Sequence, residues 1–446
     1  MFKNKKVLVY GLKKSGFSAC KLLLNHNVDV YVYDDNIQNT NDFCAKIKNK
    51  KLHKIEKFNV YENFDYVVLS PGIDNENEIV KNLKEKAIIL SELELGFLFL
   101  KDTKLIAITG TNGKTTTTSI VGHILSLKNK NTYEVGNIGT PITEKVDEIK
   151  KGSFTVCEVS SFQLENIVNF RPKISCLLNI SEDHLNRHKT LENYIKIKFN
   201  IFSNQTSRDY AIFNADDKIL INKKLDIKPK IFFFSKYHEV YGTYIFNGDI
   251  YFKSYENKIK ICSVKDINLL GEKNLENILC AICICCLLKV EPEIIKQGVK
   301  TFLPLKNRLE PVKTVNGKLY INDSKATNID SCLCALNAFK EPIILLLGGS
   351  YKGYEFDELF KDLPENVISI IAYGQTKNKI FEAGKRNGYE KIIVLKESLE
   401  ESVNYANSLK LNNSVVLLSP ACASFDQFSS YEERGDKFKE YVNKLN

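Results

Sequence analysis

The sequence predicts an α/β protein with three domains, and three observations support this prediction. The chain has 446 residues, too many for one hydrophobic core, so roughly two to four domains are expected. Short runs of β-forming residues alternate with helical segments along most of the chain. Many of these runs end in a glycine-rich or polar loop, as strands do at the ligand-binding edge of a parallel sheet. We place the domains at residues 1–95, 96–300 and 301–446.

Composition and charge narrow the class of protein. The net charge is +9, from 63 basic and 54 acidic residues. This excess would help to attract anionic substrates such as nucleotides. The alternative is that it only reflects a Lys- and Asn-rich composition. The sequence has no dense Lys/Arg block with interleaved aromatic residues, so we do not expect nucleic-acid binding. The longest apolar run, residues 278–288, is shorter than the roughly 18–20 residues of a membrane span, and no apolar signal segment is found. We therefore expect a cytoplasmic protein without membrane insertion.

The cysteines are interpreted as structural residues. Twelve cysteines in a chain without a signal segment indicate reduced thiols rather than disulfides. Cys280, Cys283, Cys285 and Cys286 cluster in the segment ILCAICICCLL, and the sequence has no second Cys or His cluster with metal-ligand spacing. We expect a buried helix that uses Cys as a small hydrophobic residue.

The first domain begins with a Rossmann-like βαβ pattern. Its predicted strands are β-rich runs at residues 6–10, 28–33 and 66–69. The loop GLKKSG at 11–16 follows the first run, and Asp35 follows the second. Lys13 occupies the place of the second glycine in a G-x-G-x-x-G loop, so this loop alone indicates a dinucleotide only weakly. The third run leads into SPGI at 70–73, either a ligand-binding loop or a plain connection.

The second domain contains the strongest motif, LIAITGTNGKTTTTS at residues 105–119. A β-rich run is followed by a glycine loop, in which Gly110 and Gly113 let backbone N–H groups point at phosphate oxygens. Lys114 supplies a charge for the β- and γ-phosphates, and Thr115 can bind Mg²⁺. The usual GxxxxGK[ST] template has four residues between the glycines, whereas this loop has only two. The order of strand, loop and Lys-Thr predicts a triphosphate site rather than a chance glycine turn.

Three further side chains of this domain are candidates for chemistry. Glu158 ends a β-rich run, where a carboxylate can hold Mg²⁺ near a phosphate loop; a surface glutamate is the alternative. His184 and His188 are four residues apart, but a zinc site would need a further ligand that the sequence does not identify. We therefore take His184 as a single functional residue or a solvated surface residue. Lys198 lies in an amphipathic segment, and a solvated face is the default interpretation.

The third domain repeats the pattern of strands that end in polar loops. Its predicted strands are residues 319–322, 343–347, 367–373 and 415–418. The loops that follow them are DSKATN, GGSYKG, GQ and SPACASFDQF, in that order. This pattern predicts a second nucleotide-fold-like sheet with a ligand-binding edge. Ser424 lacks the G-x-S-x-G surroundings of a serine nucleophile, so we interpret it as a substrate-binding residue.

Taken together, the motifs resemble the Mur ligase family, the ATP-dependent amide ligases that build the peptide stem of bacterial peptidoglycan. The segments that carry the resemblance cover nearly the whole chain and are GTNGKTT, CEVSSFQLE, SEDHLNRH, NADD, the Lys198 helix, GEKNLEN, NRLE, NDSKATN, LLLGGSYKG and SPACASFDQF. SSFQLE with SPACASFDQF is most similar to the branch that adds D-glutamate. The resemblance implies an N-terminal Rossmann-like domain, a central P-loop ATPase-like domain and a C-terminal Rossmann-like domain.

The resemblance also implies roles for individual residues. ATP would be bound by Gly110, Thr111, Asn112, Gly113, Lys114, Thr115, Thr116, Asn274, Arg308 and Asp323. Mg²⁺ would be held by Thr115, Glu158, His184 and a carbamate formed on Lys198. The catalytic residues would be Lys114, His184 and Lys198. The UDP-linked substrate would contact Ser15, Asp35, Ser70, Gly72 and Asn137, and the amino acid would be held by residues drawn from Lys325, Thr327, Lys352, Ser424 and Phe425.

The implied reaction joins two substrates with ATP. The terminal carboxylate of UDP-N-acetylmuramoyl-L-alanine becomes an acyl phosphate, and the amine of D-glutamate then forms the amide bond, a step of cytoplasmic peptidoglycan precursor synthesis. A related ligase that adds a different amino acid is the main alternative. A nicotinamide dehydrogenase leaves the phosphate loop unexplained, and a non-catalytic nucleotide-binding regulator does not need Glu158, His184 and Lys198 together. We expect the chain to act as a monomer.

Overall fold

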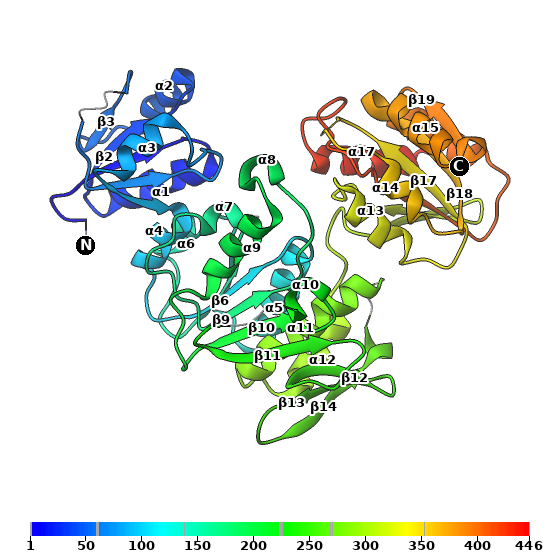
Figure 1. Ribbon diagram of the computed structural model, residues 1–446, viewed down its shortest axis with the longest axis horizontal. Helices are drawn as coiled ribbons and strands as arrows, with labels where there is room; N and C mark the ends of the chain where they lie inside the picture. Colours follow the sequence, from blue (N-terminus) through cyan, green and yellow to red (C-terminus); the bar gives the residue numbers. More distant parts are fainter. Residues whose placement is uncertain are drawn as a thin grey trace. The chain divides into compact units, whose positions relative to one another are not determined.

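The chain is described here by a computed structural model that covers residues 2–58, 62–137, 139–222, 226–267, 269, 271–351 and 353–445 (Figure 1). It forms two compact units, residues 1–267 with 276–300 and residues 268–275 with 301–446. The first unit holds two β-sheets and the second unit holds one. The predicted α/β class with three sheets is confirmed, and the domain limits at residues 95 and 300 stay predictions.

The first sheet has five parallel strands in the order β3-β2-β1-β4-β5. The elements of this part are β1 Lys6–Tyr10, α1 Lys14–Asn25, β2 Asp29–Tyr33, α2 Ile37–Lys46, β3 Leu52–Lys54, β4 Tyr66–Leu69, α3 Glu78–Lys84, β5 Ile88–Ser91 and α4 Glu92–Phe99. Val7 and Val9 of β1 join one hydrophobic cluster and Leu8 and Tyr10 join another, so both faces of the sheet are covered. The strand order reverses between β1 and β4, which places the GLKKSG and SPGI loops at the crevice where such sheets bind ligands.

The second sheet has nine strands in the order β14-β13-β12-β11-β10-β9-β6-β8-β7. Its strands are β6 Lys104–Thr109, β7 Thr132–Gly136, β8 Phe154–Glu158, β9 Ile174–Leu177, β10 Tyr210–Asn214, β11 Lys230–Ser235, β12 Gly242–Phe246, β13 Asp249–Lys253 and β14 Lys258–Ser263. The helices are α5 Lys114–Lys128, α6 Ile142–Lys145, α7 Ser161–Leu164, α8 Leu185–His188, α9 Leu191–Phe199, α10 Lys218–Ile221, α11 Glu272–Leu287 and α12 Pro292–Thr301. Strand β6 lies between β8 and β9, all parallel, so the loops after these three strands meet at one edge.

Two local features of this part follow directly from the sequence. Asn247 and Gly248 join the antiparallel strands β12 and β13 with φ angles of 50° and 79°, as a two-residue type I′ hairpin turn requires. Cys280, Cys283 and Cys285 are fully buried in α11, and all twelve cysteines are free thiols. The Cys-rich segment therefore serves as hydrophobic core.

The third sheet has six strands in the order β15-β16-β20-β17-β18-β19, parallel except for β15. Its elements are β15 Glu310–Val315, β16 Lys318–Asn322, α13 Ile329–Leu336, β17 Ile343–Gly348, α14 Asp357–Lys361, β18 Val367–Tyr373, α15 Lys377–Arg386, β19 Ile393–Lys396, α16 Leu399–Ser408, β20 Ser414–Leu418 and α17 Tyr431–Asn443. Tyr320 and Ile321 of β16 belong to different hydrophobic clusters, so helices cover both faces. The four strands predicted here from sequence are present.

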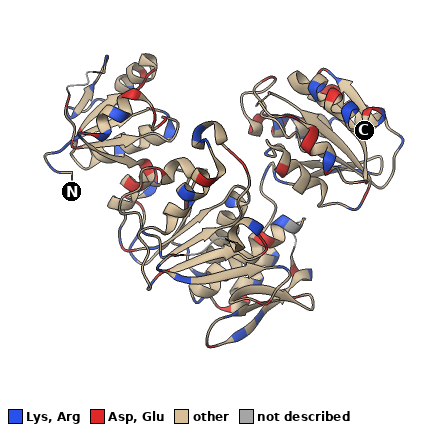
Figure 2. Ribbon diagram, in the orientation of Figure 1, with Lys and Arg blue, Asp and Glu red and all other residues tan. Residues whose placement is uncertain are grey.

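Charged residues are interspersed along both units. Figure 2 shows Lys and Arg positions and Asp and Glu positions scattered over the helices and loops of each unit. Within the described ranges, no helix has the length and apolar character needed to cross a membrane.

Arg434 in α17 is fully buried and links two loops of the third sheet. Its Nη1 donates to the carbonyl of Ala423 (3.1 Å), and its Nη2 donates to the carbonyls of Cys422 (3.0 Å) and Ser324 (2.8 Å). Its Nε donates to the Ser324 hydroxyl (3.0 Å). The guanidinium therefore fixes the loops after β16 and β20, where the predicted ligand-binding segments lie.

We expect Arg434→Met to lower the free energy of unfolding of the second unit by about 3 kcal/mol, because three buried carbonyls would lose a charged donor. Denaturant unfolding of the full chain measures this loss. Arg386→Met is the matched control, since Arg386 pairs with Asp357 at 2.6 Å but keeps 52% of its side chain exposed. That variant should lose less than about 1 kcal/mol. Equal losses in the two variants would contradict the prediction.

Candidate functional site

The phosphate loop, residues 110–114, connects β6 to α5 and needs glycine at two positions. Gly113 caps the helix with φ of 84°, and a Cβ atom there would lie 2.3 Å from Oδ1 of Asn277. Gly110 has φ of 158°, and its Cβ would lie 2.9 Å from Cβ of Leu178. Both contacts are too close for a side chain, so the spacing of the two glycines follows from the packing of the loop.

The segment after β9 supports this loop from the side. The backbone N–H of Asn112 donates to Oδ1 of Asn179 (2.8 Å), and the N–H of Thr111 donates to the Asn179 carbonyl (3.0 Å). The Thr111 hydroxyl accepts from the N–H of Ser181 (3.0 Å) and lies 3.3 Å from the Tyr194 hydroxyl. Thr111 and Asn112 were predicted as ATP-binding residues, and their measured contacts also give them a role in shaping the loop.

Two lysines converge on one carbonyl of the loop. Lys114 Nζ donates to the carbonyls of Gly110 (2.8 Å) and Thr111 (2.7 Å), and Lys198 Nζ donates to the same Gly110 carbonyl (2.8 Å). Lys198 is 1% exposed, and burial, followed by repulsion from Lys114, lowers its pKa well below the usual value. The predicted catalytic residues Lys114 and Lys198 are thus brought together, and Lys198 is buried rather than on a solvated face.

Glu158 ends β8 beside the phosphate-loop strand and is 1% exposed. Its Oε1 accepts from Nδ2 of Asn137 (3.0 Å), whereas its Oε2 is buried and accepts no hydrogen bond from any described residue. A buried carboxylate oxygen without a donor fits a cation. No three His, Cys, Asp or Glu side chains gather into a metal-binding group anywhere in the described ranges. A Mg²⁺ ion here would thus take its other ligands from the Thr115 hydroxyl, phosphate oxygens and water.

His184 precedes the short helix α8 and differs sharply from His188. His184 has a left-handed backbone (φ of 54°), its Nε2 lies 3.5 Å from Asp183, and 48% of its side chain is exposed. His188 is buried, and its Nε2 lies 3.0 Å from the Ser161 hydroxyl. Burial lowers the pKa of His188 to about 4, so this ring is neutral at physiological pH. His184 is therefore the accessible one of the two rings.

The loops after β1 and β4 lie next to each other, and Ser15 and Ser70 hydroxyl oxygens are 3.1 Å apart. Asp34 accepts from the Leu12 N–H (2.7 Å), which anchors the first loop. Asp35 is exposed, and its carboxylate accepts from the Tyr10 hydroxyl (2.7 Å). These contacts place predicted substrate residues Ser15, Asp35 and Ser70 at one edge of the first sheet.

Two other predicted substrate residues have open surroundings. Gly72 is exposed, and a Cβ placed on it would meet no atom within 4 Å. Asn137 is exposed and donates through its backbone N–H to the Glu158 carbonyl (2.9 Å). The ammonium of Lys14 in the GLKKSG loop donates to the Gly139 carbonyl, so the loops after β1 and β7 are also linked. These positions leave room for a ligand along the loop edge of the first unit.

The remaining predicted residues belong to the second unit. Asp323 follows β16 and accepts from the Ser419 hydroxyl (2.9 Å) and the Leu309 N–H (3.2 Å). Burial raises the pKa of Asp323 to about 7. The Lys325 ammonium lies 5.2 Å from the centre of the Tyr431 ring. Ser424 is buried, Phe425 is 73% exposed, and Asn274, Arg308 and Thr327 are half-buried. Lys352 lies outside the described residues.

Several residues of the site were not predicted. Asn179 supports the phosphate loop, and Asn277 packs against Gly113 and accepts from the Thr117 hydroxyl (3.2 Å). Asn179 lies two residues after β9, and its role depends on β9 pairing with β6. No local pattern marks Asn277 as a neighbour of the loop.

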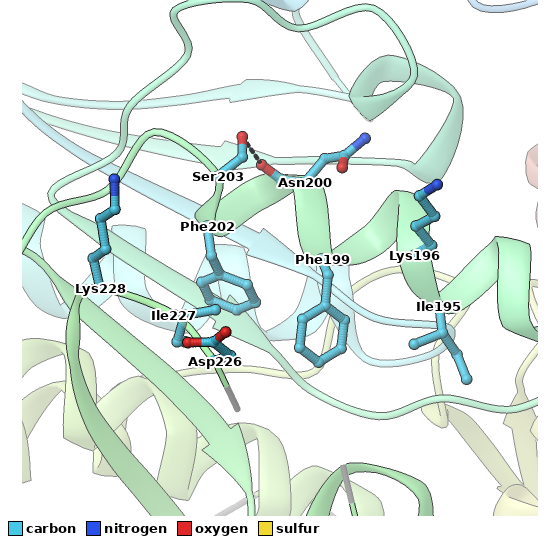
Figure 3. Close-up of a pocket in the computed structure, with 9 residues that line it drawn as sticks. All are labelled: Ile195, Lys196, Phe199, Asn200, Phe202, Ser203, Asp226, Ile227 and Lys228. Atoms are coloured by element: carbon cyan, nitrogen blue, oxygen red, sulfur yellow. Dashed lines mark hydrogen bonds between the residues drawn. The ribbon is translucent and has the colours of Figure 1, made fainter. Parts of the chain in front are cut away.

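A pocket of about 560 Å³ beside α9 lies outside the predicted site (Figure 3). It is lined by Ile195, Lys196, Phe199, Asn200, Phe202, Ser203, Asp226, Ile227 and Lys228. Figure 3 shows the aromatic rings of Phe199 and Phe202 pointing in the same direction from the helical segment, and the Ser203 hydroxyl donates to the Asn200 carbonyl (2.8 Å). Lys198 belongs to the same helix but does not line this pocket.

Comparison with known proteins gives the same family along the whole chain. Residues 108–285 match the Mur ligase middle domain, and residues 307–422 match the Mur ligase, glutamate ligase domain. The chain is 40% identical over 449 residues to the UDP-N-acetylmuramoylalanine–D-glutamate ligase of Clostridioides difficile, with 99% of each chain covered. It is 42% identical over 450 residues to the protein of the same name from Thermoanaerobacter pseudethanolicus, again with 99% of each chain covered.

Solved structures of similar fold come from related ligases. The chain is similar to UDP-N-acetylmuramate-alanine ligase MurC from Thermotoga maritima, with a TM-score of 0.59, 18% identity, and coverage of 98% of this chain and 99% of that chain. It is also similar to MurF ligase from Thermotoga maritima in complex with ADP, with a TM-score of 0.58, 16% identity, and coverage of 87% and 96%. At these identities the likeness concerns the fold.

Proposed function

The chain belongs to the Mur ligase family, and we propose that it joins D-glutamate to UDP-N-acetylmuramoyl-L-alanine in a reaction that consumes ATP. The observation that carries this proposal is the 40% identity, over 99% of both chains, to a relative named for this reaction. We place the reaction in cytoplasmic peptidoglycan precursor synthesis, carried out by a monomer with substrate, ATP and amino-acid domains at residues 1–95, 96–300 and 301–446.

The chemistry requires activation of a carboxylate, which is a poor acyl donor. The terminal carboxylate of the UDP-linked substrate attacks the γ-phosphorus of ATP, the bond to the ADP oxygen breaks, and an acyl phosphate forms. The amine of D-glutamate then attacks the acyl carbon, loses a proton to a base, and expels inorganic phosphate. Most of the protein's contribution to such a reaction is positioning and charge neutralisation.

The phosphate loop supports the ATP assignment. The loop lies at the N-terminus of α5. The first N–H groups of this helix and the positive end of its dipole favour phosphate oxygens. A bound phosphate oxygen would replace the carbonyls of Gly110 and Thr111 as acceptors of the Lys114 ammonium. This exchange replaces two neutral acceptors by a charged one, which is the stronger interaction.

Glu158 and Thr115 are the residues proposed to hold Mg²⁺, together with His184 and a modified Lys198 at a second position. When bound, Mg²⁺ would neutralise charge on the phosphate oxygens. The buried Oε2 of Glu158 supports this assignment. The lowered pKa of Lys198 leaves more of its amine neutral, and a neutral amine can add to CO₂ to form a carbamate with loss of a proton. The carbamate would place a negative charge beside Lys114.

The second unit is proposed to bind the amino acid and part of ATP. D-Glutamate carries two carboxylates, which favour lysine and hydroxyl partners, and these are assigned to Lys352, Thr327 and Ser424. Asn274, Arg308 and Asp323 are assigned to the nucleotide. The Arg434 contacts support this assignment indirectly, because they fix the loops that contain Lys325 and Ser424.

The proposed function is tested by ATP turnover of the full chain with UDP-N-acetylmuramoyl-L-alanine and a panel of D- and L-amino acids. We expect ADP and phosphate release to depend on D-glutamate, because the amine acceptor completes the reaction. The corresponding reaction without the UDP-linked substrate is the control. Turnover with another amino acid in preference to D-glutamate would replace the assigned specificity, and no turnover with any amino acid would refute the ligase assignment.

Lys114→Ala should reduce acyl-phosphate formation by roughly a factor of 10³, because a charge that stabilises the transferred phosphoryl group is removed. Rapid-quench detection of the acyl phosphate measures the effect, and circular dichroism tests the fold. Lys128→Ala is the control, since Lys128 lies in the last turn of the same helix and pairs with Glu291 at 2.9 Å. Turnover like that of the wild type in Lys114→Ala would refute the ATP assignment.

Lys198→Ala should be inactive and partly rescued by added formate or acetate, because a short carboxylate can replace the carbamate in the cavity left by the side chain. Steady-state activity against carboxylate concentration measures the rescue. Lys196→Ala, on the same helix, is the matched control and should show no response to carboxylate. Full activity of Lys198→Ala without rescue would remove Lys198 from the metal site.

A further inference from the structure

Arg187 and Glu165 form a largely buried ion pair in the first unit. Arg187 lies in α8 and Glu165 directly follows α7, and their side chains are 13% and 7% exposed. Nε of Arg187 donates to Oε1 of Glu165 (3.0 Å), and Nη2 donates to Oε2 (2.5 Å). Two parallel hydrogen bonds fix the orientation of both groups as well as the distance between them.

The same guanidinium holds the loop that follows β4 of the first sheet, residues 70–75, which we call the SPG loop. Nη1 of Arg187 donates to the Pro71 carbonyl (2.8 Å), and Nη2 donates to the Ile73 carbonyl (2.9 Å). Oε2 of Glu165 accepts from Nδ2 of Asn75 (2.7 Å). The ion pair therefore links a loop of the five-stranded sheet to helices of the nine-stranded sheet by three hydrogen bonds.

Polar contacts hold the SPG loop on the side that faces α7 and α8. An open cavity of about 420 Å³ lies next to the ion pair and is lined by both of its residues together with Asp74 and Asn75. Ile73 packs against the hydrophobic cluster of Leu8 and Tyr10 in the first sheet, so the apolar contact of the loop is with that sheet and its contact with α7 and α8 is polar. Loss of the guanidinium would leave the carbonyls of Pro71 and Ile73 without this donor and Glu165 as a buried charge.

Arg187 and His184 contact the same aromatic ring. The guanidinium lies 4.6 Å from the centre of the Phe162 ring, and the His184 ring contacts the same Phe162 at 4.8 Å between centroids. Helix α8 begins directly after His184, whose left-handed backbone is costly for a residue other than glycine. The His184 carbonyl accepts from the N–H groups of Arg187 and His188 (3.0 Å each), so the anchored Arg187 is tied to His184 through the backbone as well.

We infer that Arg187 and Glu165 are positioning residues that set the separation between the SPG loop and His184. The inference rests on the proposed function, in which Ser70 and Gly72 bind the UDP-linked substrate and His184 lies near its reacting carboxylate. A substrate that reaches from the edge of the first sheet to the phosphate loop is sensitive to this separation. ATP and D-glutamate do not bridge the two elements, so they are not expected to depend on it.

The kinetic test uses the full chain with Arg187→Met and Glu165→Gln. In each variant the KM for UDP-N-acetylmuramoyl-L-alanine should rise about tenfold, while the KM for ATP and D-glutamate stays within about twofold. Arg187→Lys should recover only part of the loss, because an ammonium cannot make the two-point contact. The double variant should be no worse than either single variant, since the two residues act as one unit.

The matched control is Arg171→Met. Arg171 pairs with Asp209 at 2.9 Å, and the two residues precede β9 and β10 at the sheet edge opposite the phosphate loop. Loss of this pair should lower stability without changing any KM. An equal rise in all three KM values for Arg187→Met, or a rise in Arg171→Met of the same size, would overturn the inference.

Hydrogen–deuterium exchange gives a readout that does not depend on activity. Amides of residues 70–77 should exchange faster in Arg187→Met than in the wild type, while amides of β4 remain protected. Unchanged exchange together with an unchanged KM for the UDP-linked substrate would overturn the inference. Failure of the wild type to turn over this substrate would instead refute the proposed function, and the exchange experiment would still decide whether the pair holds the loop.

Discussion

The contact on which the first unit depends is the meeting of two lysine side chains at the Gly110 carbonyl. Lys114 and Lys198 both donate to this oxygen, and Lys198 is fully buried. Two positive charges this close in a buried place are unfavourable, and burial together with Lys114 lowers the pKa of Lys198. The triphosphate and the Lys198 carbamate proposed above would each supply an anion here. Strand β6 lies between β8 and β9, so Glu158 at the end of β8 and Asn179 after β9 lie at the same edge as this contact.

In all three sheets, polar groups gather at the edge where the parallel strands end. Their parallel strands are buried on both faces, so polar groups can gather only where the strands end. In the first sheet the reversal of order between β1 and β4 brings Ser15 and Ser70 within 3.1 Å. In the third sheet the neighbouring strands β16 and β20 bring Asp323 and Ser419 within 2.9 Å. Each edge is therefore a consequence of topology and not of one motif.

The sequence predicted well those features that are contiguous along the chain. The strands at 6–10, 66–69 and 367–373 match the structure residue for residue, and Glu158 ends its strand as expected. Features that depend on strand order were not predictable, because β6 pairs with β8 and β9 rather than with the next strand, β7. The support of the phosphate loop by Asn179 was missed for this reason. Arg187 was missed because a charged residue in a four-residue helix has no periodic pattern that indicates burial.

The buried cations share a physical role that explains why they lie behind the loops. A loop that turns its backbone N–H groups toward an anionic ligand turns carbonyl oxygens the other way, and these buried acceptors need donors. Lys198 donates to Gly110, Arg187 to Pro71 and Ile73, and Arg434 to Cys422 and Ala423. A guanidinium can satisfy several carbonyls at fixed angles, whereas an ammonium suits a single crowded one. The cations therefore fix the shape of each loop before a ligand arrives, which reduces the ordering cost of binding.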